Sequence, residues 1–216
     1  MRVIAIDGPA GAGKSTVAKQ VALATGLPYL DTGAMYRCIA YAADVRKLDI
    51  HNAEAMGVIA RESKVDVEDT VACLNDTDIS HLIRSPEINQ IVSVIAAHTP
   101  VRDAMREQQR SWISAHNGGV VEGRDIGTVV FPDAVLKIFL TASPEVRAQR
   151  RVDQSGGDVA EIAASIAHRD HLDSSRSDSP LRPAQHSHVV DSSIHTIDQV
   201  VTEIVTLFEK AVHDYG

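Results

Sequence analysis

The sequence predicts an α/β fold built on a parallel sheet with helices on both faces. Short apolar runs typical of strands alternate with helical segments along most of the 216 residues, which is the pattern of successive strand–helix–strand units. The apolar run Val3 to Ile6 leads directly into the glycine-rich residues 8–13, and a segment of helical composition follows. This order of strand, loop and helix supports the same fold class.

Five strands are expected, because five short runs rich in branched apolar residues are bounded by Gly, Pro or polar residues. They are Arg2 to Ile6, Pro28 to Leu30, Gly119 to Glu122, Leu136 to Leu140 and His188 to Asp191. The expected helices are Lys14 to Thr25, Gly33 to Lys47, Pro100 to Ala115, Pro144 to Val152, Val159 to Asp173 and Thr196 to His213. Two of these begin at proline, a favoured first-turn residue. The last carries an apolar stripe at helical spacing, which indicates core packing.

Two interruptions of the alternating pattern lie within what we expect to be one domain, residues 1–216. Between Asp49 and Thr99 the sequence has short mixed runs, which predict an inserted lobe over residues 49–99. Residues 153–158 read DQSGGD, the composition of a mobile loop. Because arginines precede this loop, residues 151–159 are a candidate lid that carries positive charge over a phosphate site. A solvated helix end with a flexible turn is the alternative.

Composition and charge exclude several classes of protein. A formal net charge of −8 argues against a nucleic-acid-binding surface, which needs clustered positive charge. No apolar run reaches the roughly 20 residues that cross a bilayer, and no secretory signal is recognisable before the first strand. We therefore expect a cytoplasmic protein without membrane association. Cys38 and Cys73 lack metal-binding spacing and fit unpaired thiols in a reducing compartment, so no role is assigned to them.

Residues 8–15 read GPAGAGKS and fit the phosphate-binding pattern GxxxxGK[ST] at each fixed position. Glycines allow the backbone N–H groups to surround a polyphosphate, Lys14 can bridge its β- and γ-phosphates, and the Ser15 hydroxyl can ligate Mg²⁺. The helix that follows would direct its N-terminal dipole at the phosphates. The residues expected to hold the nucleotide are Gly8, Pro9, Ala10, Gly11, Ala12, Gly13, Lys14, Ser15 and Thr16. A glycine-rich turn that matches by chance is the alternative.

Three further segments carry a resemblance to a known family. They read LDTGAMYR at residues 30–37, EGRDIGTVVFPDA at residues 122–134 and DSSRSDSPLRP at residues 173–183. Together with the phosphate loop, they resemble the bacterial type of cytidylate kinase in order and spacing, over nearly the whole chain. A phosphate loop alone is shared by many GTPases, ATPases and small-molecule kinases, whereas this combination is far more specific.

The resemblance implies a P-loop NTPase fold with a five-stranded parallel sheet in the order 2-3-1-4-5, an inserted lobe that binds the nucleoside monophosphate, and a short lid. It also implies phosphoryl transfer from ATP to CMP or dCMP, which gives ADP and CDP or dCDP, with Mg²⁺ as cofactor. The expected partners are these small nucleotides, with no nucleic acid or membrane. Nothing in the sequence demands more than a monomer.

Phosphoryl transfer between two nucleotides brings two anionic groups together, so alignment and charge neutralisation matter more than a general base. The resemblance places the acceptor phosphate on Arg37, Arg124 and Arg176, in line with the γ-phosphate held at Lys14. From the lid side, Arg147 or Arg151 would stabilise charge on the transferring group. The expected catalytic residues are therefore Lys14, Arg37, Arg124, Arg176 and Arg151.

Cytosine offers an amino donor at N4 and acceptors at N3 and O2, so a selective pocket pairs an acceptor with the first and an arginine with the others. By resemblance, Asp125 and Thr32 face N4, and Arg102 reaches N3 and O2. Family contacts to the ribose correspond to Ser93, Arg169 and Asp173. The expected substrate-binding residues are Thr32, Arg37, Ser93, Arg102, Arg124, Asp125, Arg169, Asp173 and Arg176.

Several of these residues also have a simpler interpretation. Arg124 and Asp125 follow a strand and could form a structural ion pair. Asp7 ends the first strand and could organise metal-bound water, although capping of the loop is favoured. His168 and His171 lie three apart with aspartates nearby, but no third or fourth ligand of matching spacing supports a metal site.

Three other functions compete with the cytidylate kinase interpretation. A GTPase would need a guanine-reading NKxD motif, and the chain contains no Asn-Lys pair. A kinase for another monophosphate or a hydroxylated metabolite would share the phosphate loop, but would not need Thr32, Arg102 and Asp125. A regulator that binds nucleotide without turnover is the third.

Overall fold

The computed structural model describes residues 1–215 and divides into two compact units. The first unit contains residues 1–29 together with residues from 117 onward, and the second contains residues 30–116.

The central sheet has five strands in the order β2-β6-β1-β7-β8. Their bounds are β1 Arg2–Asp7, β2 Tyr29–Asp31, β6 Gly118–Gly123, β7 Leu136–Thr141 and β8 His188–Asp191. Numbered along the chain as five strands, this is the predicted order 2-3-1-4-5, which confirms the expected sheet. The pairings of β6, β1, β7 and β8 are parallel. Only the first residue of β2, Tyr29, belongs to the first unit.

The register of the sheet brings two loop segments to the same edge. Along β1 and β6, Arg2 lies opposite Gly118 and Asp7 lies opposite Gly123, so the two strands end level with each other. Because the strands are parallel, the chain leaves both at their carboxyl ends, where ligands of open α/β sheets bind. The residues that follow are the phosphate loop after Asp7 and the Arg124–Asp125 pair after Gly123.

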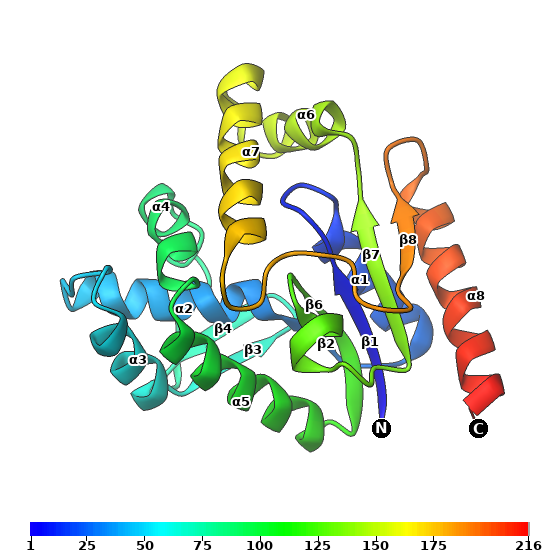
Figure 1. The fold of residues 1–216 in the computed structure, drawn as a ribbon, viewed down its shortest axis with the longest axis horizontal. Helices are drawn as coiled ribbons and strands as arrows, with labels where there is room; N and C mark the ends of the chain where they lie inside the picture. Colours follow the sequence, from blue (N-terminus) through cyan, green and yellow to red (C-terminus); the bar gives the residue numbers. More distant parts are fainter. Residues whose placement is uncertain (216) are drawn as a thin grey trace. The chain divides into compact units, whose positions relative to one another are not determined.

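Four α-helices and one π-helical turn complete the first unit as far as the structure describes it. They are α1 Lys14–Thr25, η1 Ile126–Val130, α6 Pro144–Ser155, α7 Val159–Ser175 and α8 Ile197–Tyr215. Val17 and Val21 of α1 and Ile204 and Phe208 of α8 join the strand side chains in one apolar core. Figure 1 shows α8 running beside β8 and β7, while α6 begins beyond the end of β7 and packs against α7.

The second unit is built from four helices and a small antiparallel sheet. Its elements are α2 Thr32–Val45, α3 Ala53–Glu62, β3 Val65–Glu68, β4 Val71–Leu74, β5 Thr77–Asp78, α4 Pro86–Ile95 and α5 Thr99–Ala115. Helix α2 packs against α4, and α3 packs against α5. Side chains cap three of the helix starts: Asp31, Asn52 and Ser85 each accept a backbone N–H from the first turn. The lobe that the sequence predicts at residues 49–99 lies within this unit.

Some elements of the structure were not predicted from the sequence, and some predicted ends differ from the observed ones. No structure was predicted for α3, α4 and the β3-β4-β5 sheet, whose tight turns place Asp69, Asn75 and Asp76 at positive φ. Such turns interrupt the hydrophobic pattern before any run is long enough to read. Helix α6 continues to Ser155, three residues beyond the predicted end, because Gly156 is the first residue that leaves the helix.

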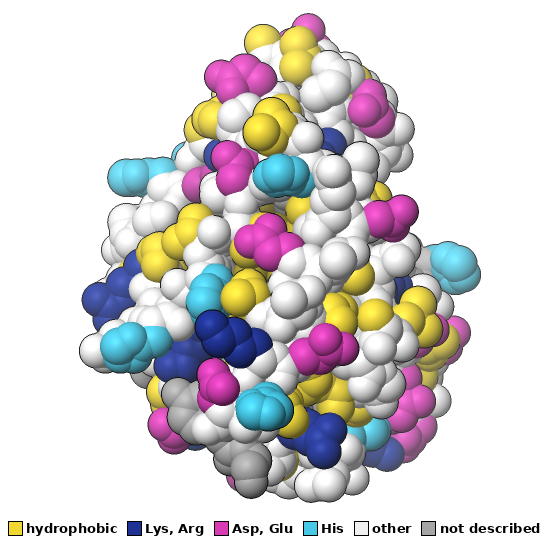
Figure 2. Space-filling model, turned by 90° about the vertical axis from the view of Figure 1, so that its right-hand side faces the viewer, with side chains coloured by type: hydrophobic (Ala, Val, Ile, Leu, Met, Phe, Trp, Pro, Cys, Tyr) yellow, Lys and Arg dark blue, Asp and Glu magenta, His cyan; other side chains and the backbone are white. Residues whose placement is uncertain are grey.

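None of the helices within residues 1–215 combines the length and the apolar composition needed to cross a membrane. Figure 2 shows one face of the molecule, on which acidic, basic and histidine side chains are interspersed with hydrophobic ones.

Gly118 provides a test of how tightly β6 is held against β1. Its φ is +134°, and an added Cβ would lie 2.4 Å from the Arg2 carbonyl oxygen. Gly26, which caps α1, also has a positive φ, +67°, but an added Cβ there meets nothing within 4 Å. We expect Gly26→Ala to lower the free energy of unfolding by about 1 kcal/mol, from backbone strain alone. Gly118→Ala adds a backbone clash and should cost about 3 kcal/mol or more.

Urea unfolding of the two variants beside the wild type measures this difference. Equal losses of stability in the two variants would show that the close approach of β6 to β1 at Gly118 carries no additional constraint.

Candidate functional site

The predicted phosphate loop, residues 8–13, connects β1 to α1 as expected. Gly13 precedes the first helical residue, Lys14, whose side chain is buried. The Lys14 Nζ donates a hydrogen bond of 2.9 Å to the Pro9 carbonyl oxygen, across the loop. Ser15 and Thr16 are exposed in the first turn of α1. A buried amine therefore lies inside the loop, and two hydroxyl-bearing residues lie at its mouth.

The electrostatic environment of Lys14 disfavours its charge. Burial, followed by the nearby Arg124 guanidinium, lowers the pKa of Lys14 to about 7, although Glu122 and Asp7 oppose the shift. Glu122 is a buried carboxylate at the end of β6, and it accepts a hydrogen bond from the Tyr29 hydroxyl. A Lys14 amine with this pKa gains a proton when an anion approaches, because the anion favours the charged form.

Asp7 is bonded to the turn after β6. Its two carboxylate oxygens accept the backbone N–H groups of Ile126 and Gly127, each at 2.8 Å. Burial raises the pKa of Asp7 to about 6, despite these two hydrogen bonds. Of the two interpretations from sequence, capping is the one that these contacts match, but the capped segment is η1 and not the phosphate loop.

Asp173 gathers two of the predicted phosphate-binding arginines. It is buried on α7, and its carboxylate accepts hydrogen bonds from Arg124 Nε at 2.7 Å and from Arg176 Nη2. Burial alone would raise the pKa of Asp173, but Arg124, Arg176 and Arg169 outweigh it and hold the pKa below its usual value. The ion pair of Arg124 is thus formed with Asp173, on α7. Asp125, which follows Arg124 in the chain, is also buried.

The candidate lid arginines have different surroundings. Arg147 is buried on α6, where its Nε donates to the Ala142 carbonyl oxygen at 3.1 Å and its Nη1 donates to the Ala10 carbonyl oxygen at 2.9 Å. The same guanidinium forms an ion pair with Asp170 of α7. Arg151 is exposed, and its guanidinium makes no hydrogen bond or ion pair with any residue in the described part of the chain.

The other predicted substrate-binding residues lie in the second unit. Arg37 of α2 donates to the Ile83 carbonyl oxygen at 3.2 Å and to the Asn89 side chain of α4, the helix that also carries the half-buried Ser93. Arg102 of α5 is 1% exposed; it donates to the Ala96 carbonyl oxygen at 3.0 Å, and its guanidinium carbon lies 5.5 Å from the centre of the Tyr36 ring. Thr32, the first residue of α2, is buried.

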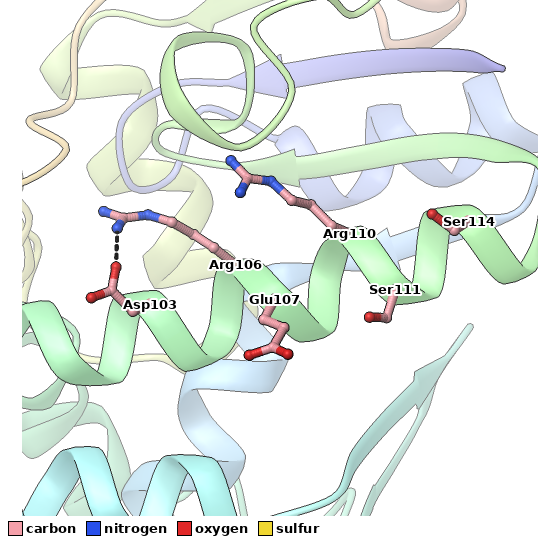
Figure 3. A pocket seen from close by; sticks show the side chains of 6 residues that line it. All are labelled: Asp103, Arg106, Glu107, Arg110, Ser111 and Ser114. Atoms are coloured by element: carbon pink, nitrogen blue, oxygen red, sulfur yellow. Dashed lines mark hydrogen bonds and ion pairs between the residues drawn. The ribbon is translucent and has the colours of Figure 1, made fainter.

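A hollow of about 600 Å³ lies along α5. Its polar side chains diverge: in Figure 3, Arg106 and Arg110 extend to one side of α5, while Glu107 and Ser111 extend to the other. Arg106 also forms an ion pair with Asp103 at 2.7 Å. Polar groups that diverge from one helix do not converge on a ligand as the groups of a small-molecule site do.

The phosphate loop is the candidate metal site. Within residues 1–215, no group of three or more His, Cys, Asp or Glu side chains could hold a metal ion. Mg²⁺ bound with a nucleotide needs only one or two protein oxygens, because phosphates and waters supply the other ligands. Ser15 fits this requirement, since its side chain is exposed at the start of α1 and makes no hydrogen bond with a described residue.

The sequence model that describes the cytidylate kinases matches residues 4–210. The chain belongs to the cytidylate kinase family. It is 44% identical over 216 residues to a cytidylate kinase of Shouchella clausii, with 96% of each chain covered. It is 45% identical to a cytidylate kinase of Desulfitobacterium hafniense, with 97% of this chain and 93% of the relative covered. As a member of this family, the chain is a kinase that uses ATP to phosphorylate a nucleoside monophosphate.

Some cytidylate kinase relatives are much longer. A bifunctional pantoate ligase/cytidylate kinase of Prochlorococcus marinus is 43% identical over 97% of this chain, and the chain spans 44% of the length of that relative. Solved structures support the fold: TT1252 from Thermus thermophilus aligns with a TM-score of 0.51 and 21% identity over 99% of this chain and 97% of that one. An uncharacterized protein from Eubacterium ventriosum aligns with a TM-score of 0.56 and 11% identity, over 97% and 99% of the two chains.

Sequence reasoning missed several polar residues of the first unit that the structure places beside the loop. Glu122 was read only as part of a motif, although a carboxylate inside the apolar run VVEG is a signal of a buried charge. Asp170 entered only as a neighbour of two histidines. Arg150 donates to the Ala12 carbonyl oxygen at 3.4 Å and to Ser192 Oγ at 2.9 Å. No pattern along the sequence connects Ser192 to the loop.

The lowered pKa of Lys14 predicts proton uptake when ATP binds. Its pKa, lowered to about 7, leaves most of the amine neutral at pH 8. Bound phosphates favour the charged form, so the pKa rises and binding should take up close to one proton at pH 8. Calorimetry of ATP binding in two buffers that differ in ionisation enthalpy measures this uptake. Lys14→Arg, which remains charged at pH 8, is the control; the same uptake in this variant would exclude Lys14 as the source.

Proposed function

We propose that the protein transfers the γ-phosphoryl group of ATP to CMP or dCMP, with Mg²⁺, and forms ADP and CDP or dCDP. The observation that carries the proposal is the family match over residues 4–210, together with the buried Lys14 amine that lies near the Arg124 guanidinium in the first unit. A reaction between two anions requires this concentration of positive charge, because the attacking phosphate oxygen already carries negative charge and needs no general base.

In the proposed reaction, charge neutralisation is divided among basic side chains. Lys14 and the backbone N–H groups of the loop bind the phosphates of ATP, except at Pro9, which has no N–H, and at Ala10, whose N–H donates to Asp170. Arg37, Arg124 and Arg176 bind the phosphate of the acceptor, and the paired contact of Asp173 with Arg124 and Arg176 fixes the directions of these two guanidinium groups. Fixed donors stabilise the charge of the transition state without reorganising during transfer.

The exposed Arg151 is the proposed lid cation. Its guanidinium makes no hydrogen bond or ion pair with a described residue, so it can turn toward a transferring phosphoryl group. Arg147 is less suited, because its guanidinium is already bonded to Ala142, Ala10 and Asp170.

Ser15, with Thr16 beside it, would hold Mg²⁺ at the mouth of the phosphate loop. When bound, the ion supplies neutralisation of charge on the ATP phosphates.

Base selection is proposed for Thr32, Asp125 and Arg102. The Asp125 carboxylate and the Thr32 hydroxyl would accept from the cytosine N4 amino group, and Arg102 would donate to N3 and O2. Uracil would place its O4 acceptor against the Asp125 carboxylate, which leaves buried polar groups unsatisfied. In the second unit Thr32 is 3% exposed and Arg102 is 1% exposed, and in the first unit Asp125 is 4% exposed; buried polar groups discriminate strongly between donors and acceptors. Ser93, Arg169 and Asp173 are proposed to contact the ribose.

A panel of acceptors tests the reaction. With ATP and Mg²⁺, we expect ADP release with CMP and dCMP, and at least about 100-fold lower kcat/KM with UMP, AMP, GMP and shikimate. Preference for another nucleoside monophosphate would still support a nucleoside monophosphate kinase, but would overturn the assignment of Thr32, Asp125 and Arg102 to cytosine. Binding of ATP with no turnover on any acceptor would support a regulator instead.

Substitutions separate the phosphate and base functions. Lys14→Ala should abolish turnover with every acceptor, because the phosphates of ATP lose a charge that lies inside the loop. Asp125→Ala should lower kcat/KM for CMP by about 100-fold and for UMP much less. Asp125→Asn offers an amide donor to uracil O4, and should therefore raise the ratio of UMP to CMP turnover above that of Asp125→Ala. Equal losses for CMP and UMP in both Asp125 variants would exclude a base-reading role.

A further inference from the structure

The backbone N–H and carbonyl groups of Ala10, inside the phosphate loop, are both hydrogen-bonded to a charged pair that comes from two helices. The backbone N–H of Ala10 donates to Asp170 Oδ1 at 3.0 Å, and the Ala10 carbonyl oxygen accepts from Arg147 Nη1 at 2.9 Å. Arg147 and Asp170 also form an ion pair with each other. The three residues thus form a closed ring of hydrogen bonds that joins the loop to α6 and α7.

Both members of the pair are held away from solvent. The side chain of Arg147 is 10% exposed and that of Asp170 is 18% exposed. Arg147 is fixed further by its hydrogen bond to Ala142, the residue that follows β7. The Cα of Gly11 lies against Arg147, where an added Cβ would come within 3.0 Å of the arginine Cβ. These contacts therefore fix the positions of two consecutive loop residues, Ala10 and Gly11.

A desolvated ion pair contributes little to stability, because the cost of removing its charges from water offsets their attraction. Its effect is greater on geometry, since charge-assisted hydrogen bonds are short and directional. The phosphate loop depends on geometry, because the N–H groups of the residues that follow Ala10 must already point at the polyphosphate when ATP arrives.

We propose that Asp170 is a positioning residue for the ATP phosphates: its carboxylate holds the Ala10 N–H, with Arg147 as the charged partner, and so presets the phosphate loop. The proposal rests on the proposed function, in which this loop binds ATP. Asp170 does not touch the reacting atoms. It acts through Ala10.

Direct binding measurements test the proposal with Asp170→Ala, Asp170→Asn and the exposed control Asp133→Ala. In Asp170→Ala the loop loses its acceptor, and we expect the Kd for ATP with Mg²⁺ to rise about tenfold, the loss of one hydrogen bond to a charged group. The Kd for CMP, measured without ATP, should stay within twofold. Asp170→Asn keeps an oxygen that can accept from Ala10 but loses the charge, so its Kd for ATP should fall between the two. Asp133→Ala should match the wild type.

The outcomes are distinct. An Asp170→Ala protein that is folded, has a lowered melting temperature and binds ATP within twofold of the wild type would show a structural role only and overturn the proposal. An equal rise of Kd for ATP and CMP would also overturn it. If Asp170→Ala does not fold, Asp170→Asn decides: a rise in Kd for ATP of threefold or more supports the proposal, and a value within twofold overturns it. A wild-type protein that binds no ATP would instead refute the proposed function.

Discussion

The crowding of positive charge around the phosphate loop is the constraint on which the organisation of the first unit depends. Burial lowers the pKa of Lys14 most, and the nearby Arg124 and Arg169 lower it further. Such a cluster costs folding free energy unless carboxylates are placed among the cations. Asp7, Glu122, Asp170 and Asp173 supply them, on β1, β6 and α7. At Lys14 the carboxylates do not fully offset the effects of burial and of the neighbouring cations, since its pKa is still lowered. The negative charge of a bound polyphosphate would offset them.

The topology of the sheet makes this crowding possible. Strands β1 and β6 are adjacent and parallel, and they end in register at Asp7 and Gly123. Residues more than a hundred positions apart in the chain therefore leave the sheet at one edge. Asp7 then bonds the N–H groups of Ile126 and Gly127, which ties the two strand ends together and fixes where the chain turns after Arg124 and Asp125. The carboxylate at the end of β1 thus sets the position of the residues that follow β6.

The sequence predicted the parts of the molecule whose information is local. The strands of the central sheet have strong apolar runs, and the phosphate loop is a contiguous pattern, so both could be placed within a few residues. In the second unit, α2 and α5 were predicted, whereas α3, α4 and the β3-β4-β5 sheet were not, because the short strands are joined by tight turns. At the site, residue types were predictable but partners were not: the pairing of Arg124 with Asp173, 49 positions away, and of Ala10 with Asp170, 160 positions away, depends on the folded chain. The assignment of individual residues to substrate atoms stays a prediction.

Helix α7 carries both of these long-range contacts on neighbouring turns. Asp170 reaches the phosphate loop and Asp173 reaches Arg124. In an α-helix, residues three apart are separated by about 4.5 Å along the axis and lie on nearly the same face. The helix therefore fixes the spacing and the relative direction of the two carboxylates. One residue inserted between Asp170 and Asp173 would turn one carboxylate by about 100° away from its partner. Between these two positions, α7 can therefore accept side-chain substitutions far more easily than any change of length.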